Sequence, residues 1–185
     1  MENSEKILES AEDIVEVLSS YHIDAVVIGA VALAAHHYVR QTEDIDLGIN
    51  ASLSSLHSVV QSLNANGYKA VLREPDMDDP LGGVIDVSGS FGLVQIVNYG
   101  GRFPAVIDDA LHTARMSVRA GSRLKVVPLP YLIALKLYAG GHKSKADIIE
   151  LIVRNPNLDL DEVRLLCGKY RLAGLEELIR EAESG

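Results

Sequence analysis

The stretch RQTEDIDLGIN, residues 40–50, places two acids, Asp44 and Asp46, one residue apart in an otherwise apolar run. In a strand, residues two apart project from the same face, so both carboxylates point together while Ile45 and Leu47 point into the core. Carboxylates held side by side repel unless they are protonated or bridged by a cation. Mg²⁺ suits such ligands, because it takes one or two carboxylates and keeps the phosphates of its substrate. The run therefore predicts a strand that carries a magnesium site, although an Asp-x-Asp alone also fits a solvated strand end.

The segments on either side strengthen the first interpretation. Upstream, the apolar strand Ala25–Ile28 runs into Gly29 and then a small-residue helix at Val31–Tyr38. Such a turn directs backbone N–H groups at a phosphate, while the plainer alternative is a tight turn. Downstream, Asp86 lies in the short strand Val84–Val87. As a third carboxylate it would complete a two-metal site, which activates an attacking oxygen and stabilises a leaving one. The alternative is a strand-end acid.

Hydrophobic periodicity divides the rest of the chain into a mixed first half and a helical second half. Before Pro128, we expect strands at Glu43–Ile49, Tyr68–Arg73 and Leu93–Val97, helices at Ser4–Ser20, Ser52–Asn64 and Phe103–Ala110, and a loop at Glu74–Gly83. Val84–Val87 and Leu93–Val97 flank a Ser-Gly-Ser turn, which predicts a hairpin. Two short segments, Ala114–Val118 and Leu124–Val127, flank a further turn. After Pro128, we expect helices at Tyr131–Tyr138, Ala146–Val153, Leu160–Cys167 and Leu175–Glu183. The predicted fold class is α+β: a small mixed β-sheet flanked by helices (residues 1–127), followed by a helical C-terminal part (residues 128–185).

The amino-acid composition limits the classes of function that the protein can have. The chain has 185 residues, 48% of them hydrophobic, which suits one domain with a substantial core. Its 17 Lys and Arg against 26 Asp and Glu give a net charge of −9, so bulk charge does not attract nucleic acid, although a local basic cleft remains open. The single cysteine, Cys167, allows no intramolecular disulfide and favours a reducing compartment. The longest apolar stretch is too short to span a bilayer, and the polar N-terminus is unlike a signal peptide. We therefore expect a cytoplasmic protein with no membrane association.

Two stretches carry a resemblance to a known family. The run IGAVALAAHHYVRQTEDIDLGIN, residues 28–50, resembles the core signature of the polymerase-β-like nucleotidyltransferase superfamily. Within it, His36, Arg40, Thr42 and the residues 44–47 resemble the form found in bacterial minimal nucleotidyltransferases and in toxin-type nucleotidyltransferases of abortive-infection systems. The second stretch, VVPLPYLIALKLYAGGHKSKADIIEL, residues 126–151, resembles a Pro-headed helix with a Leu-Lys pair and a following Lys-Asp-x-x-Asp-Ile element. Lys136, Lys143, Asp147 and Ile148 fit that pattern. The resemblance covers about residues 25–152.

The resemblance implies the nucleotidyltransferase fold, Mg²⁺ as cofactor, an NTP donor, and transfer of a nucleoside monophosphate with release of pyrophosphate. The acceptor is left open between an RNA such as tRNA, a protein and a small molecule. The toxin-type likeness further implies a component of a toxin–antitoxin or phage-defence system, with an antitoxin protein as a candidate partner.

The same resemblance assigns roles to individual residues. It implies that Asp44 and Asp46 hold the metal ions, and that Asp86 is the third acid, a catalytic metal ligand that helps to activate the acceptor. It assigns nucleotide binding to Gly29, Ala30, Arg40, Thr42, Lys143 and Asp147. Among these, Lys143 contacts the triphosphate and Asp147 steadies it.

Three residues depart from the family pattern. Ala30 replaces the usual second Gly or Ser, His37 stands where Gly often follows His, and Ser144 stands where Asp is usual. Ala30 and Ser144 weaken the expected triphosphate site. An alternative function is therefore a catalytically weak nucleotide- or partner-binding module that retains the fold. A third hypothesis is a purely structural interaction domain, but such a domain has no reason to place three acids on strand ends beside a glycine turn.

Some polar residues have plainer explanations. Arg40 either meets a phosphate or neutralises Asp44, and equally suits the C-terminal end of a helix, where a cation complements the helix dipole. Lys136 lies on an apolar helix, so we expect its side chain to extend to solvent along that helix. His36 and His37 lack partners at zinc-ligand spacing, and we expect one buried and one exposed imidazole.

Overall fold

The computed structural model describes residues 2–42, 44–76 and 80–184, with side chains from residue 5 onward. The strands are β1 (Ala25–Ile28), β2 (Asp44–Ile49), β3 (Lys69–Arg73), β4 (Val84–Gly89) and β5 (Gly92–Asn98). The helices are α1 (Glu2–Ser20), α2 (Gly29–Ala35), α3 (Leu53–Ala65), α4 (Pro104–Thr113), α5 (Leu129–Ala139), α6 (Gly141–Arg154), α7 (Leu160–Lys169) and α8 (Leu175–Ser184).

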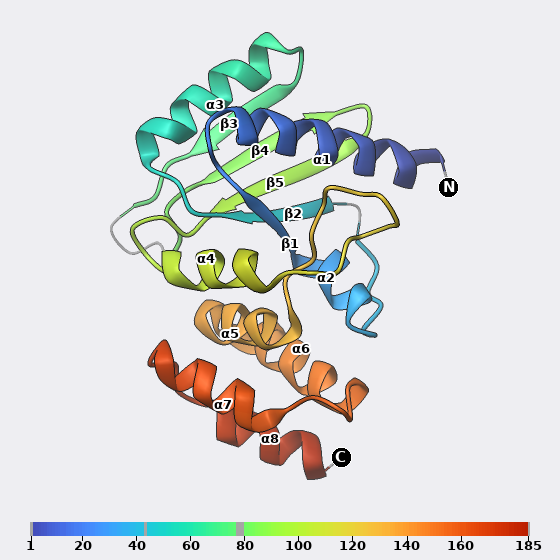
Figure 1. Ribbon diagram of the computed structural model, residues 1–185, viewed down its shortest axis with the longest axis vertical. Helices are drawn as coiled ribbons and strands as arrows, with labels where there is room; N and C mark the ends of the chain where they lie inside the picture. The colour runs from blue at the N-terminus through green and yellow to red at the C-terminus, as the bar shows by residue number, and fades with distance from the viewer. Residues whose placement is uncertain (1, 43, 77–79, 185) are drawn as a thin grey trace.

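The described strands form one mixed sheet in the order β1-β2-β5-β4-β3 (Figure 1). β2 pairs antiparallel with β1 and parallel with β5. β4 and β5 form the predicted hairpin, and β3 pairs antiparallel with β4 at the edge. The consequence that matters for the site is that β5, and not β4, is the neighbour of β2.

Alternation along β2 sends its side chains to opposite faces of the sheet. Ile45, Leu47 and Ile49 are buried in the hydrophobic cluster that contains residues of α1 and α3. On the other face, a Cβ at Gly48 would meet Ile107 of α4 at 3.0 Å, so α4 packs directly on the end of β2. Asp44 and Asp46 occupy the same face as Gly48 but lie toward the N-terminal end of the strand.

Helices α1 and α3 cover one face of the sheet, and α4 lies between the other face and the C-terminal helices (Figure 1). α3 begins as the sequence predicts: the side chain of Ser52 caps the helix by accepting a hydrogen bond from Ser55 N–H at 3.1 Å. At its other end, Gly67 has a φ of +87°, which suits glycine and ends the helix.

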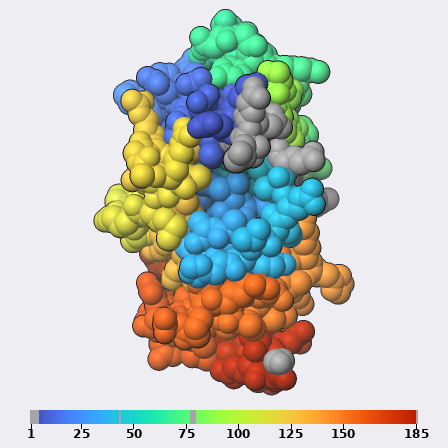
Figure 2. Space-filling model, turned by 90° about the vertical axis from the view of Figure 1, so that its right-hand side faces the viewer, coloured from blue at the N-terminus to red at the C-terminus, as the bar shows by residue number. Residues whose placement is uncertain are grey.

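The C-terminal helices share a core with the first half of the chain. One cluster of buried residues extends from Val26 of β1 and Leu33 of α2 through Ile133 of α5 to Ile179 of α8. Across the same boundary, Asn155 donates to the His36 carbonyl oxygen at 2.9 Å. Figure 2 shows the cyan segment after α2 lying directly on the orange helices below it. The boundary predicted between residues 127 and 128 therefore does not separate two cores, because one hydrophobic core extends across it.

The α+β fold class is confirmed, and most elements lie within a few residues of their predicted bounds. α2 is displaced: it runs over 29–35 and not 31–38, because His36 leaves the helix and His37 takes a φ of +67°. That conformation suits glycine better than histidine. The segments around 114–127 form only isolated bridges, at Ser117–Lys125 and Val27–Val126. Glu43, and residues 77–79 of the predicted loop, lie outside the described residues. None of the described helices is long and apolar enough to cross a membrane.

Candidate active site

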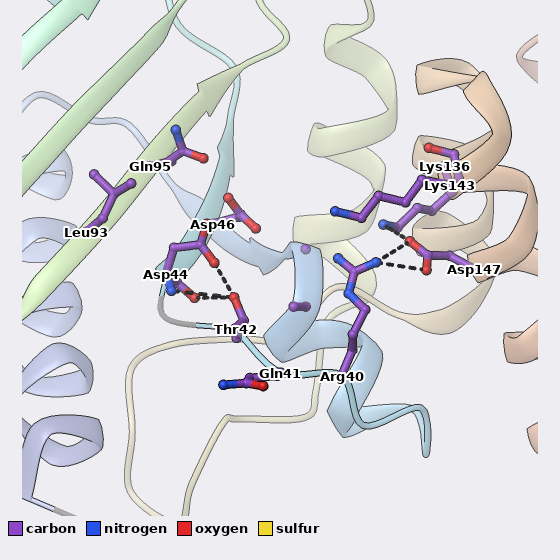
Figure 3. Close-up of a pocket in the computed structure, with 13 residues that line it drawn as sticks. Arg40, Gln41, Thr42, Asp44, Asp46, Leu93, Gln95, Lys136, Lys143 and Asp147 are labelled. Atoms are coloured by element: carbon purple, nitrogen blue, oxygen red, sulfur yellow. Dashed lines mark hydrogen bonds and ion pairs between the residues drawn. The ribbon is translucent and has the colours of Figure 1, made fainter.

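A cavity of about 650 Å³ opens at the N-terminal end of β2, between the sheet and helices α5 and α6 (Figure 3). It contains most of the residues that the sequence singles out. Its lining consists of Gly29, Ala30, Arg40, Gln41, Thr42, Asp44, Asp46, Leu93, Gln95, Lys136, Lys143, Ser144 and Asp147. Figure 3 shows Asp44 and Asp46 on one side of the cavity and Arg40, Lys136, Lys143 and Asp147 on the other.

The two acids of β2 differ in their surroundings. Asp44 accepts a short hydrogen bond from the Thr42 hydroxyl, which is a structural role for Thr42 beside the predicted one. The pKa of Asp46 is raised to about 6, first because the carboxyl is buried and second because Asp44 is close. Lys136, Arg40 and Lys143 oppose that rise. A carboxylate pair that is this costly to ionise is a pair that a cation would stabilise.

The position of the Asp46 carboxylate requires a residue without a side chain at position 29. Ile28, the last residue of β1, pairs with Asp46, so the chain turns over the Asp46 carboxylate at the next residue. Gly29 has a φ of +64°, and a Cβ added there would lie 1.8 Å from Asp46 Oδ2. The sequence resemblance predicts a phosphate contact at this glycine, and the structure adds that its missing side chain makes room for the acid. Ala30 beside it is buried, with 5% of its surface exposed.

Replacing Gly29 with alanine is therefore expected to damage both the backbone and the acid pair. A non-glycine residue in the left-handed region costs about 1–2 kcal/mol, and the methyl group would in addition displace the Asp46 carboxylate. The matched control is Gly121→Ala, since Gly121 has a φ of +77° but open space around the added Cβ. Thermal denaturation should show a larger loss for Gly29→Ala, and calorimetry should show loss of Mg²⁺-dependent NTP binding in that variant alone. Equal losses from both variants would contradict the role of Gly29.

The opposite side of the cavity is built around one buried acid. Asp147 of α6 has 2% of its side chain exposed and accepts from Lys136 Nζ at 2.6 Å. Arg40 Nη1 lies 3.1 Å and 3.3 Å from its two oxygens. Lys143, one turn before Asp147 on the same helix, makes no ion pair within the part of the chain that the structure describes. Asp147 therefore forms a clamp that holds Arg40 and Lys136, and its expected role at a triphosphate stays a prediction.

The charges of the cavity balance. The lining contains three acids, Asp44, Asp46 and Asp147, and three bases, Arg40, Lys136 and Lys143. A bound divalent cation would make the cavity positive by two charges. An anion with several phosphates is therefore attracted strongly only when a cation occupies the acid pair.

The donor set fits a hard divalent cation that shares its ligands with a substrate. Within the described ranges, no cluster of three or more His, Cys, Asp or Glu residues could enclose a metal. Asp44 and Asp46 supply two carboxylates on one face of β2. That number suits Mg²⁺, which is typically bound by one or two carboxylates together with substrate phosphates and water.

Asp86 is not part of this cavity. Its register partner on β5 is Gln95, and Gln95 is also the partner of Asp46, so one strand separates the two acids. Two strand spacings amount to roughly 10 Å between backbones. The Asp86 carboxylate accepts from Arg73 Nε at 2.8 Å and from Gln95 Nε2 at 2.7 Å, and the first contact helps to hold its pKa below the ordinary value against the effect of burial. The side chain next to Asp46 in the sheet is thus a neutral amide, and the third acid predicted at this site is not brought to it.

Sequence reasoning missed several residues of the cavity. They are Gln41, Leu93, Gln95 and, as a member of the ion-pair clamp, Lys136. Of these residues, only Lys136 could have been found from the sequence. A lysine on an apolar helix must either extend to solvent or pair with an acid, so an acidic partner could have been expected. The two histidines are as predicted: His37 is exposed, while His36 is buried, has a pKa lowered by burial, and has Nε2 2.8 Å from the Val127 carbonyl oxygen.

A scan against protein-family models finds no match, and a search of curated proteins finds none either. Solved structures do match over most of the chain. The solution structure of the antibiotic-resistance factor ANT(2″)-Ia is 16% identical, covers 91% of this chain and 92% of its own, and has a TM-score of 0.55. A crystal structure of ANT(2″)-Ia with adenylyl-2″-tobramycin is 15% identical, with coverages of 89% and 96% and a TM-score of 0.53. An antigenic nucleotidyltransferase-like protein from Paracoccidioides brasiliensis is 17% identical, with coverages of 90% and 88% and a TM-score of 0.52.

At these identities the likeness establishes the fold. The chain has the nucleotidyltransferase fold, as its sequence resemblance implies. The likeness to the toxin-type subgroup stays a prediction.

Proposed function

We propose that the protein is a Mg²⁺-dependent nucleotidyltransferase, which transfers a nucleoside monophosphate from an NTP to an acceptor hydroxyl and releases pyrophosphate. The observation that carries the proposal is the division of a single cavity into two sides. Asp44 and Asp46 of β2 face Arg40, Lys136 and Lys143 across it. A cation site and a phosphate site are what an NTP–Mg²⁺ complex needs, and a structural domain has no use for either.

The basic side would bind the triphosphate. Arg40 can donate two parallel hydrogen bonds to phosphate oxygens, while Lys136 and Lys143 act as point charges. Asp147 holds Arg40 and Lys136 through the contacts of 2.6–3.3 Å described above, so their positions are set before the nucleotide arrives. Fixed charges of this kind cost little reorganisation during reaction.

The acidic side would hold the metal. Mg²⁺ bound by Asp44 and Asp46 would neutralise charge on the phosphates and polarise the reacting phosphorus. Gly29 leaves the space that the Asp46 carboxylate occupies. Thr42 orients Asp44 by donating to it.

One observation favours a second candidate function, the catalytically weak binding module. The place beside Asp46 in the sheet is taken by Gln95, which cannot accept a proton from the acceptor as a carboxylate would. Ala30 and Ser144 also depart from the family pattern. A module of this kind would bind NTP and Mg²⁺ but release no pyrophosphate.

The acceptor and the biological role belong to the same proposal. One structural neighbour is described with adenylyl-2″-tobramycin, which makes a small molecule a candidate acceptor. A role in a toxin–antitoxin or phage-defence system, with an antitoxin partner and a cytoplasmic location, is supported only by the sequence resemblance.

Isothermal titration with each NTP, in Mg²⁺ and in EDTA, tests the proposal. We expect binding in Mg²⁺ and at least about tenfold weaker binding in EDTA, because the metal-free cavity is neutral. Incubation with α-labelled NTPs and cell extract should then give a labelled product and pyrophosphate. Binding without pyrophosphate release would favour the weak module. Absence of NTP binding in Mg²⁺ would exclude both.

A further inference from the structure

A second cleft adjoins the first on the side of Asp44 that faces away from the basic groups. Its volume is about 600 Å³, and it shares Thr42, Asp44 and Leu93 with the cavity described above. Figure 3 shows Leu93 on the far side of the two acids from Arg40 and Lys143. The cleft is otherwise lined by Gly92 and by the apolar side chains of Ile7, Leu8, Val31, Ile45, Phe91 and Val118.

Five separate segments form the walls of the cleft. Ile7 and Leu8 come from α1, and Val118 comes from the loop between α4 and α5. The other three segments are α2, the start of β2 with Thr42 before it, and residues 91–93 at the β4–β5 turn. In Figure 1 the loop that follows α4 rises to lie beside α1.

The loop is fastened to α1 by polar contacts. Arg119 Nη2 lies 3.3 Å from Glu12 Oε2, and the Ser122 hydroxyl donates a short hydrogen bond to the same carboxylate. The walls are therefore held in place by contacts outside the cleft itself.

The charge of the cleft is as informative as its shape. Asp44 is the one charged side chain among its described lining residues, and it stands at the opening shared with the other cavity. A polycationic ligand such as an aminoglycoside needs several carboxylates, which these walls do not offer. The lining is mostly hydrophobic with a few polar groups at one end, and its volume lies within the range of about 300–1,000 Å³ that is typical of small-molecule sites.

We propose that this cleft is the acceptor subsite, and that the acceptor is a small molecule with a neutral apolar or aromatic body and a hydroxyl group at one end. This inference rests on the nucleotidyl transfer proposed above. With its body between α1 and the β4–β5 turn, the acceptor presents its hydroxyl at Asp44, where the two cavities meet. Its oxygen forms a bond to the α-phosphorus of the NTP, the bond from that phosphorus to the β-phosphate oxygen breaks, pyrophosphate leaves, and the hydroxyl proton passes to water.

The test uses the full chain and N-phenyl-1-naphthylamine, a neutral apolar probe whose fluorescence rises on leaving water. We expect saturable binding that Leu8→Gln weakens by at least about tenfold, because a polar amide replaces apolar contact area. The matched control is Leu165→Gln, the same change on α7 at a side chain that is 76% exposed and far from the cleft in sequence and fold. Ile7→Gln repeats the test in case Leu8→Gln lowers the melting temperature.

Saturating Mg²⁺ and a non-hydrolysable NTP analogue should leave the probe bound, since the two ligands occupy adjoining sites. Unchanged probe affinity in both Leu8→Gln and Ile7→Gln would overturn the inference, as would displacement of the probe by the nucleotide or by tobramycin. A dimer seen by light scattering and dissolved by Leu8→Gln would assign the cleft to a second copy of the chain and overturn it too. The nucleotide is also titrated into the protein in the absence of the probe. If the nucleotide does not bind in that titration, the proposed function fails. If the nucleotide binds but the probe does not, only the proposed acceptor subsite fails.

Discussion

Asp46→Asn is expected to reduce nucleotidyl transfer by roughly 10²–10³-fold or more, which is the range that follows loss of one group that stabilises charge at a reacting centre. Asp46 is the acid of β2 whose pKa burial raises, and its carboxylate fills the space that Gly29 leaves. An amide has a similar shape but lacks the charge that a metal needs. Calorimetric titration of the variant with NTP should accordingly show little difference between Mg²⁺ and EDTA.

The same substitution should stabilise the metal-free protein at neutral pH. The pKa of Asp46 is raised to about 6 in the folded state from an ordinary value of 3.8, by burial first and by Asp44 second. Well below pH 3.8 the carboxyl is protonated in both states and carries no penalty. As the pH rises from about 3.8 to above 6, the unfolded state ionises first, so the free energy of unfolding falls by roughly 3 kcal/mol. The amide that replaces the carboxyl does not titrate, so in EDTA at pH 7–8 the variant should be more stable by about 1–3 kcal/mol, and its stability should vary less between pH 4 and 7.

Asp86→Asn provides the matched control. It makes the same chemical change on a neighbouring part of the sheet, but Asp86 lies one strand beyond Gln95 and contacts Arg73. Because Asp86 is outside the cavity, we expect NTP binding in Mg²⁺ to change by less than about threefold. If Asp86→Asn abolishes metal-dependent binding as Asp46→Asn does, the site holds three acids and the placement of Asp86 outside it is wrong.

The difference between Asp46 and Asp86 illustrates which parts of the site local sequence predicts. Residues 44 and 46 share a face because successive side chains of a strand point to opposite faces of the sheet, whatever surrounds the strand. Whether Asp86 joins them depends on which strand lies beside β2. That pairing joins segments about 50 residues apart, and no local pattern near either segment specifies it. The hairpin of β4 and β5 was predictable from its turn, but its orientation against β2 was not.

The prediction that the Lys136 side chain extends to solvent is wrong for a related reason. Helix α5 is apolar around much of its circumference, with Leu132, Ile133, Ala134 and Leu135 all buried. Its hydrophobic pattern therefore does not indicate which direction is solvent, and extension of the lysine to the surface was the simplest expectation. The partner that explains the lysine, Asp147, lies 11 residues later on the next helix. The resemblance assigned Asp147 to the triphosphate site, but its contact with Lys136 depends on the packing of α5 on α6.

Asp147→Ala is expected to be the most destabilising of the substitutions considered, at about 3 kcal/mol. Removing one partner of a buried ion pair costs about 3–5 kcal/mol, because the remaining charge is left without compensation. Asp147 has 2% of its side chain exposed and compensates two cations, Lys136 with 16% exposed and Arg40 with 29% exposed. Since both cations retain some access to water, we place the expected loss at the lower end of that range. Without the acid, the two cations also repel each other.

A matched control distinguishes the effect of losing a buried ion pair from the effect of losing any ion pair. Asp161→Ala removes an acid that is 89% exposed and pairs with Arg164 at 2.9 Å on α7. Exposed pairs contribute about 0–1 kcal/mol, so urea denaturation should show a loss of that size for Asp161→Ala and a much larger one for Asp147→Ala. Similar losses in the two variants would show that the Asp147 clamp does not stabilise the fold.

The two variants should also differ in nucleotide affinity. If Asp147 positions Arg40 and Lys136, its removal raises the KM for NTP, even though the cavity becomes more positive by one charge. If charge alone decides, the KM falls instead. Measuring KM and kcat for Asp147→Ala at a temperature where the variant is fully folded therefore decides between positioning and bulk attraction. In the proposed function these bases bind phosphates at defined places, so we expect positioning to dominate.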